Sequence, residues 1–382
     1  MKKKQLGQFF TIHSDYILNG FEGFIRGKKI IDPFAGSGDL IKWAKKNGAK
    51  NVKGFDVDKK YVNDKSIFLN DSINNPKVYD FVITNPPYLN INKADIETKE
   101  KYFSKTNLED LYQISLSSII NSQEGIVIVP INFLSAENSM KIRDLFFSRF
   151  KIIKMNYFKQ QVFPDTTYNV ISFYYKQKEN SFVDKFIIDT TINPDNQRVD
   201  IELHKKFHWS IGGNFLATIK NQKNVLGIYR LTDKDIKSGP IKIKAAYNHI
   251  NNRHDFKISK DVYNLIKSNI ILLKAIDSGS EEGKIALENI KNYGVECLIS
   301  KKTSRHMIYL ISETKLSIGE QKKIIDLFNQ EMEKLRSNYL SLFLTNYRDN
   351  NRKRVSFDFV YKFINYLYSN KIQDNPVRSL YY

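Results

Sequence analysis

The residues best suited to chemistry stand in one short stretch, Asn85-Pro86-Pro87-Tyr88. The residues before it, Lys77–Thr84, are rich in β-branched and aromatic side chains and predict a buried strand. Two consecutive prolines must end that strand because proline has no N–H to give to a sheet. The side-chain carbonyl of Asn85 and a neighbouring backbone carbonyl could then accept both N–H groups of an aromatic amine, while Tyr88 stacks on the same flat base.

A glycine turn lies upstream, in the string Asp-Pro-Phe-Ala-Gly-Ser-Gly of residues 32–38. It follows a short apolar strand from Lys29 and precedes a helical pattern that runs to Lys45. Gly36 and Gly38 permit positive φ angles and let a ligand approach the backbone closely. The third glycine of the dinucleotide fingerprint is missing, and no Gly-Lys-Ser/Thr follows, so the turn does not indicate a phosphate cradle.

Acidic residues end the next two predicted strands. Val52–Asp56 ends in an acid about 20 residues beyond the glycine turn, where a carboxylate can accept ribose hydroxyls. Asp56 is preferred to Asp58 because it ends the strand directly, although either could cap a helix over Lys59–Ile67. A third strand begins at Ile67 and ends near Asn70 and Asp71. The order of strands and helices is an alternating β/α pattern.

These segments resemble the amino-group S-adenosylmethionine (SAM) methyltransferases, and the Asn-Pro-Pro-Tyr form is most similar to that of the DNA adenine-N6 enzymes. The resemblance covers roughly residues 5–175 and follows the motif order of the gamma class. The matching segments are Leu6–Thr11 (motif X), Asp32–Gly38 (motif I), Asn85–Tyr88 (motif IV), Asn107–Leu116 (motif V) and Val162–Pro164 (motif VIII).

The resemblance implies SAM as the cofactor, S-adenosylhomocysteine as the product, and no metal. Asp32 and the glycine backbone would face the methionine end of SAM, and Thr11 would contact it, unless Thr11 only caps the following helix. Asp71, or alternatively Asn70, would bond the exocyclic amine of the cofactor adenine. The full set of expected cofactor contacts is Phe10, Thr11, Asp32, Phe34, Ala35, Gly36, Gly38, Asp56, Asp71, Asn85 and Pro87.

The catalytic residues that the resemblance implies are Asn85, Pro86, Pro87, Tyr88 and Phe163. Phe163 would stack on the flipped adenine opposite Tyr88. Tyr168 is the second choice for that role, and a simple core phenylalanine is the alternative interpretation of Phe163.

The expected fold class is α/β. A Rossmann-like SAM-dependent methyltransferase domain, with a mixed seven-stranded sheet and helices on both faces, is expected over residues 1–180. A polar segment near residues 177–186 suggests the boundary to an α+β target-recognition domain over residues 181–382. Helices are also expected over Met140–Phe150, where Arg143 and Arg149 look like surface charges, and over Ser317–Tyr339.

The formal net charge of the 382 residues is +19, and both halves carry more Lys and Arg than Asp and Glu. This charge predicts a polyanion as partner, with a generally basic soluble surface as the alternative, and the resemblance implies that the polyanion is double-stranded DNA. The run Asn248–His254 could read base edges or form a plain polar loop, and lysines in Leu89–Thr106 could touch phosphates or only solvent. The expected DNA contacts are Arg253, Arg348, Arg352, Lys353 and Arg354.

Other classes of site find little support. The single cysteine, Cys297, excludes a disulfide within the chain and a thiolate zinc cluster. Asp277, Glu282 and Lys284 have the residue types of a nuclease site, but a loop is the favoured interpretation. No apolar run suits a membrane span and no signal peptide is visible, so we expect a soluble protein inside a cell, either the bacterial cytoplasm or a virus-infected host.

The sequence thus predicts a site-specific methyltransferase that acts on N6 of a flipped adenine in duplex DNA, as the modification methylase of a restriction-modification system. Action as a monomer is expected, and whether a restriction endonuclease accompanies the protein is left open. The alternatives are an amino-methyltransferase that acts on ribosomal RNA adenine or a protein glutamine, and an inactive DNA-binding subunit.

Overall fold

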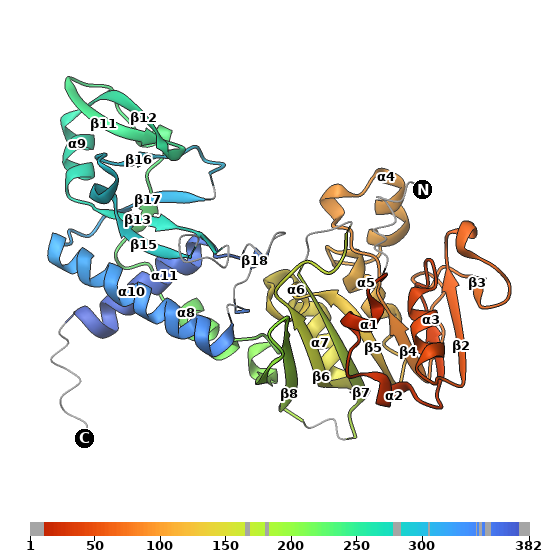
Figure 1. Cartoon of the computed structure of the whole chain (residues 1–382). Helices are drawn as coiled ribbons and strands as arrows, with labels where there is room; N and C mark the ends of the chain where they lie inside the picture. Colours follow the sequence, from red (N-terminus) through yellow and green to blue (C-terminus); the bar gives the residue numbers. More distant parts are fainter. Residues whose placement is uncertain are drawn as a thin grey trace, which may run out of the picture. The chain divides into compact units, whose positions relative to one another are not determined.

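The computed structural model divides the chain into two compact units, one ending at Gly213 and one beginning at Asn214, with a short segment at Tyr347 grouped with the first (Figure 1). Each unit is described by itself. No helix in the described part of the chain is both long and apolar enough to cross a membrane. The described residues are 11–164, 169–179, 183–277, 284–304, 306–340, 342–343, 346–347 and 353–373.

The first unit is built on a nine-stranded sheet in the order β3-β2-β1-β4-β5-β7-β6-β8-β9. All neighbours are parallel except that β7 is antiparallel to both β5 and β6, and β9 to β8. The strands are β1 (Lys29–Asp32), β2 (Asn51–Asp56), β3 (Ile67–Leu69), β4 (Phe81–Thr84), β5 (Glu124–Pro130), β6 (Phe150–Phe158), β7 (Val170–Gln177), β8 (Lys185–Asn193) and β9 (Gln197–His204). The first seven strands form the mixed sheet that the sequence predicts, and two more extend it.

This extension moves the end of the first unit away from the expected boundary near residue 180. Strand β8 pairs with β6 along five residues, and β9 pairs with β8 along eight. Beyond β9, Trp209 packs on Phe147 and Phe186, and the N–H of Ile211 donates to the carbonyl of Leu134. The polar residues after β7 therefore lie between two strands of one sheet, which composition alone does not distinguish from a linker.

Helices cover both faces of this sheet because successive strand side chains alternate between them. On one face, Ser172 donates to the carbonyl of Ile17 in α1. On the other, its neighbour Phe173 meets Phe146 of α7 edge to face. The helices are α1 (Ser14–Ile17), α2 (Glu22–Ile25), α3 (Asp39–Lys46), α4 (Ile96–Thr98), α5 (Leu111–Ser118), α6 (Asn132–Ser135) and α7 (Met140–Arg149). The helix considered over Lys59–Ile67 is only one 3₁₀ turn, Lys59–Tyr61.

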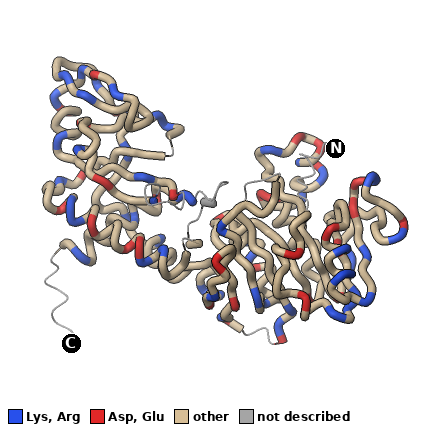
Figure 2. Tube along the Cα trace, viewed as in Figure 1, with Lys and Arg blue, Asp and Glu red and all other residues tan. Residues whose placement is uncertain are grey.

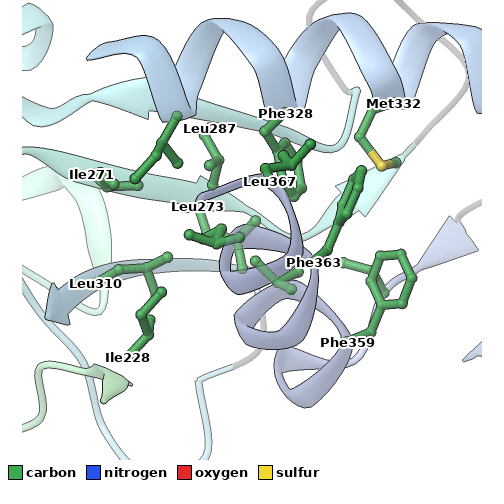
Figure 3. Packing of buried hydrophobic residues seen from close by; sticks show 14 of the residues in the cluster. Ile228, Ile271, Leu273, Leu287, Leu310, Phe328, Met332, Phe359, Phe363 and Leu367 are labelled. Carbon is green, nitrogen blue, oxygen red and sulfur yellow. The ribbon is translucent and has the colours of Figure 1, made fainter. Parts of the chain in front are cut away.

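The second unit contains a four-stranded sheet, β10-β17-β13-β15, and a three-stranded sheet, β12-β11-β16. Figure 3 shows Phe328 and Met332, together with Phe359 and Phe363, in one apolar core with Leu273 of the four-stranded sheet. The strands are β10 (Ile228–Arg230), β11 (Ile241–Tyr247), β12 (His249–Ile258), β13 (Ile271–Lys274), β14 (Ile276–Asp277), β15 (Ala286–Asn289), β16 (Leu298–Ile299), β17 (Met307–Ser312), β18 (Asn346–Tyr347) and β19 (Lys353–Arg354). The helices are α8 (Gly213–Lys220), α9 (Lys260–Lys267), α10 (Ile318–Tyr339) and α11 (Phe357–Leu367).

Helix α10 agrees with its prediction because its amino-terminal end carries a strong local signal. Ser317 accepts a hydrogen bond from the N–H of Glu320, and the Glu320 carboxylate accepts from the N–H of Ser317. This reciprocal capping satisfies two backbone donors that the helix cannot pair by itself.

Arg143 was expected on the surface, and that prediction is wrong. Its side chain is 2% exposed and donates to the backbone carbonyls of Phe133, Ala136 and His208 at 2.7–3.0 Å. It thereby ties α6 and α7 to the segment beyond β9. Burial lowers the pKa of Arg143 to about 10, well within the range where it stays charged at neutral pH.

We predict that Arg143→Met destabilises the first unit by roughly 2–4 kcal/mol. Buried carbonyls left without a donor cost about 1–3 kcal/mol each, and removal of the desolvated Arg143 charge offsets part of that cost. Chemical denaturation measures this loss. The control is Arg149→Met on the same helix, where an exposed side chain bonds Asn121 and the change should stay within about 0.5 kcal/mol. Equal stability of the two variants would contradict the structural role.

Candidate active site

Four parallel strands, β1 to β4, end at one edge of the sheet, and the predicted chemical residues follow these ends. A cleft there holds about 750 Å³ of empty space, part of it open to solvent, within the range of small-molecule sites. Its lining includes nine of the predicted residues: Thr11, Asp32, Phe34, Ala35, Gly36, Asp56, Asp71, Asn85 and Pro87. Gly38, Pro86, Tyr88 and Phe163 are outside the lining, and Phe10 lies outside the described residues.

The glycine turn is fastened to the end of β2. Gly36 has a φ of 50°, and its N–H donates to the Oδ2 atom of Asp56 at 2.8 Å. Gly38 has a φ of 77° and begins α3. Gly54 in β2, which the sequence analysis did not single out, makes room for the turn, since a Cβ there would lie 2.6 Å from the Cβ of Ala35. A glycine inside a strand was the available signal.

Asp56 and Asp58 have different environments. The carboxylate of Asp56 is buried in the cleft and accepts from the N–H groups of Gly36 and Asp58, both at 2.8 Å. Burial raises its pKa. Asp58 instead caps the 3₁₀ turn by accepting from the N–H of Lys60 and pairs with its amine at 2.9 Å. The geometry therefore favours Asp56 as the residue that faces a ligand.

Asp32, 1% exposed, has one satisfied oxygen and one unsatisfied oxygen. Its Oδ1 accepts from the N–H of Phe34 at 3.0 Å and from the hydroxyl of Thr84 at 2.8 Å. Its Oδ2 is buried without a hydrogen-bond partner among the described residues. Burial raises the pKa of Asp32 to about 7, with the Asp56 charge adding to the rise. A cationic or hydrogen-bond-donating ligand in the cleft would relieve this cost.

Asp71 and Asn70 both line the cleft, but their side chains are committed differently. The Asn70 amide is used within its own turn, where it bonds Ser72 and Asn75. Asp71 pairs with Lys101 at 3.0 Å and accepts from the Tyr102 hydroxyl at 3.2 Å. Burial alone would raise the pKa of Asp71, but hydrogen bonds from Lys101 and Asn74 outweigh it, and the pKa is lowered. At least one lysine of the Leu89–Thr106 segment thus contacts the site itself.

Asn85 is held on both sides of its amide. Its Nδ2 donates to the Thr11 hydroxyl at 3.1 Å, and its Oδ1 accepts from the Tyr88 hydroxyl at 2.6 Å. Helix α1 begins at Ser14 with His13 at its N-cap, so Thr11 does not cap it. The Tyr88 hydroxyl also lies 3.0 Å from the carbonyl of Ile128. The Asn85 oxygen that was expected to receive an amine is therefore already in use.

The two expected stacking rings do not form a slot in this structure. Tyr88 is 6% exposed, and its ring meets that of Phe163 at 65° with centroids 6.4 Å apart. Tyr112, which the sequence analysis did not single out, meets Tyr88 at 85°. A flat base between Tyr88 and Phe163 would need these rings to turn toward parallel. Tyr168 lies outside the described residues.

The predicted DNA contacts in the second unit have mixed outcomes. Arg253 is exposed on β12. Because β12 begins at His249, the run Asn248–His254 lies largely on a strand and not in a loop. Lys353 is 8% exposed and its amine donates to the carbonyl of Leu340, which leaves it unavailable to a phosphate in this structure. Arg354 lies on β19, which pairs with β14. Arg348 and Arg352 lie outside the described residues.

The nuclease-like residues have a structural explanation. Asp277 is buried and accepts from the Nε atom of Arg336 at 2.9 Å, which secures α10 to β14. Lys284 pairs with Glu333, and Glu282 lies outside the described residues. Over the ranges that the structure describes, no group of three or more His, Cys, Asp or Glu side chains could hold a metal ion.

The strand order, the glycine turn and the acid-lined cleft define a Rossmann-like methyltransferase fold. Residues 24–163, which contain the segment from β1 to Phe163, match the family described as Eco57I restriction-modification methylase. The chain thus resembles DNA-modifying methyltransferases, as predicted. None of the curated proteins matches the sequence.

One solved structure supports the same fold, and two others are similar over about half of the chain. The type IIL restriction-modification enzyme MmeI in complex with DNA is 12% identical, with a TM-score of 0.50 over 92% of this chain and 64% of that chain. A modification subunit of a putative type I restriction enzyme from Vibrio vulnificus YJ016 is 13% identical, with a TM-score of 0.39 over 56% of this chain and 52% of that chain. The EcoKI M protein is 14% identical, with a TM-score of 0.39 over 49% of each chain. This chain therefore spans about half the length of these two type I subunits.

We predict that Asp32 makes SAM binding depend on pH. The carboxyl is mostly protonated below pH 7 and ionised above it, and a sulfonium cation favours the ionised form. The affinity for SAM should thus rise between pH 6 and pH 8, by at most about tenfold per pH unit, as calorimetry can measure. Asp32→Asn should flatten this rise, and Asp58→Asn, outside the cleft, should preserve it. A rise that persists unchanged in Asp32→Asn contradicts the assignment.

Proposed function

We propose that this chain transfers a methyl group from SAM to the N6 amine of adenine in double-stranded DNA, as a modification methylase of a restriction-modification system. One observation carries the proposal: Asn85 lines the same cleft as the buried carboxylates of Asp32 and Asp56 and the half-buried carboxylate of Asp71. This supports a carboxamide that accepts an amine next to a bound cationic, hydroxyl-bearing nucleoside cofactor.

The residues of the cleft suit SAM. The unsatisfied buried oxygen of Asp32 suits the positive methionine end, and Asp56 has remaining acceptor capacity for ribose hydroxyls. Asp71 would accept from the cofactor's adenine amine while sharing its pairing with Lys101. Bound SAM supplies a methyl group on a positively charged sulfur, so no strong base is needed at the acceptor amine.

The catalytic loop then acts by positioning. The Asn85 Oδ1 and the Pro86 carbonyl would accept the two hydrogens of the adenine amine, so that its nitrogen lone pair is left to attack the methyl group. The methyl–sulfur bond breaks, S-adenosylhomocysteine leaves, and the methylated nitrogen loses one proton to water. For this to happen the Tyr88 hydroxyl must leave Asn85, after which the rings of Tyr88 and Phe163 can enclose the base. The adenine must leave the base stack of the duplex to lie between these two rings, as it does in other enzymes that act on bases.

The second unit offers a basic ribbon for DNA. Strands β11 and β12 pair so that Lys244 lies opposite Asp255 and Ala246 lies opposite Arg253. Lys242, Lys244, Arg253 and Lys257 are all exposed, and Figure 2 shows Lys and Arg outnumbering acidic residues along both strands. A two-stranded ribbon fits the major groove, where arginine and asparagine side chains read base edges. We assign target recognition to the second unit on this ground.

The proposal is tested by incubating unmethylated genomic DNA with the protein and labelled SAM, followed by single-molecule mapping of modified bases. N6-methyladenine at one short motif is the expected product. Label found on RNA or protein, with none on DNA, would overturn the choice of substrate.

We predict that Asn85→Ala lowers kcat for methyl transfer at least 100-fold, because both the acceptor of the amine and its orientation are lost. The dissociation constant for SAM, measured by calorimetry, should change by less than about threefold. Equal loss of SAM binding and methylation would show that Asn85 only shapes the cofactor cleft.

We predict that Tyr88→Phe tightens productive DNA binding, because the variant keeps the ring and removes the hydroxyl that occupies Asn85. A net hydrogen bond of about 0.5–1.5 kcal/mol corresponds to a fall in KM for DNA of roughly 2- to 10-fold, with kcat nearly unchanged. Tyr88→Ala serves as the contrast and should lose most activity with the stacking ring. A higher KM in Tyr88→Phe would mean that the hydroxyl assists the substrate.

A further inference from the structure

A second polar pocket lies on the first unit, away from the acid-lined cleft. It holds about 700 Å³ of empty space, part of it open to solvent, between strands β6, β8 and β9 and the turn after α1. Its lining contains two cations, five amide or hydroxyl side chains and a glycine, with no acidic residue: Asn19, Gly20, Lys154, Asn156, Thr191, Asn193, Asn196 and Arg198.

The two cations, Lys154 and Arg198, have neighbouring acids in the strand register but no ion-pair or hydrogen-bond partner among the described residues. Asp189 is opposite Lys154 in the strand register and Asp200 is opposite Asp189, but among the described residues neither acid forms an ion pair with Lys154 or Arg198 within 4 Å. Asp195, at the turn between β8 and β9, forms an ion pair with Lys159 at 2.9 Å.

The pocket is held by buried polar contacts. Asn156 is buried, and its Nδ2 donates to the carbonyls of Ile17 at 3.3 Å and Asn19 at 3.0 Å. Gly20 has a φ of 82°, and a Cβ on it would lie 3.0 Å from the amine of Lys154. The Lys154 amine therefore lies against a backbone that only glycine leaves open.

The pocket belongs to the same edge of the sheet as the Asn85 loop. Strands β6 and β8 run in the same direction as β4, and Asn156 and Asn193 stand at or near their carboxyl ends. The segment that contains α1 connects the two places, because Thr11 contacts Asn85 and Asn19 contacts Asn156. The eight residue steps from Thr11 to Asn19 span at most about 28 Å, so one bound duplex can contact both places.

We propose that this pocket binds a backbone phosphate of the DNA substrate, an inference that rests on the proposed function. Two cations without an ion-pair or hydrogen-bond partner among the described residues, with neutral amide and hydroxyl donors around them, form a site for a single oxyanion group. A phosphate bound there anchors the duplex to the catalytic unit itself, and orients it independently of the base-reading surface of the second unit.

The test compares two variants that each remove two positive charges from the same sheet. In Lys154→Gln/Arg198→Gln the pocket loses its cations. In the control, Lys176→Gln/Lys185→Gln, the charges are lost at the edge of the sheet opposite the pocket. Lys176 lies near the carboxyl end of the antiparallel strand β7, and Lys185 lies at the amino end of β8. The probe is a 30-bp DNA duplex of random sequence, titrated at several salt concentrations, and the duplex RNA of the same sequence forms a parallel arm.

The expected result is a dissociation constant for DNA that is roughly tenfold larger in the pocket variant than in the wild type. The slope of log K against log salt should fall by about one, as for the loss of one phosphate contact. SAM binding and the melting temperature should match those of the wild type, and the control should keep the wild-type slope. Arg198→Gln alone, at an exposed position, gives half of the charge change with little risk to folding.

An unchanged slope in the pocket variant, or an equal fall in the control, overturns the proposal of a phosphate site. If the wild type still methylates DNA, the proposed function stands even when the phosphate site is overturned. A loss confined to the RNA arm assigns the site to another nucleic acid. A wild-type protein that binds no DNA overturns both.

Discussion

The site depends on a single geometric constraint, which is that four parallel strands deliver polar side chains to one edge of a sheet. Such an edge brings residues that are far apart in sequence within bonding distance, as Gly36 and Asp56 show with a hydrogen bond across 20 residues. That bond fixes the glycine turn against β2, and Gly54 beneath it has no side chain to interfere. Without this convergence Asp32, Asp71 and Asn85 would have no common cleft.

Much of this arrangement could be predicted because its signals are local. A β-branched run ended by two prolines fixes the place of Asn85, and an acid directly after a strand fixes that of Asp56. Helix α10 was equally predictable, since Ser317 and Glu320 form a capping pair ahead of a regular apolar pattern. In each case neighbouring residues determine the conformation, and distant contacts only reinforce it.

The features that could not be predicted depend on distant partners. Arg143 looks like a surface charge on an amphipathic helix, and only the fold reveals the three carbonyls that it satisfies. The segment near residue 180 has the composition of a linker, and only the pairing of β8 with β6 shows that the sheet continues after it. Tyr88 belongs to a recognisable motif, but its orientation is set by Asn85 and by the carbonyl of Ile128, which is contributed by another strand.

The extension of the sheet also has a consequence for how such a chain could diversify. Because β8 and β9 complete the sheet and Trp209 and Ile211 pack or bond back onto it, the first unit is finished only at Gly213. Recombination that joined a new second unit at residue 180 would expose an unpaired strand edge and an apolar surface around Phe147. A junction at Gly213 would keep the nine-stranded sheet complete, so the first break in the chain between the two units lies about thirty residues beyond the point where the sequence composition changes.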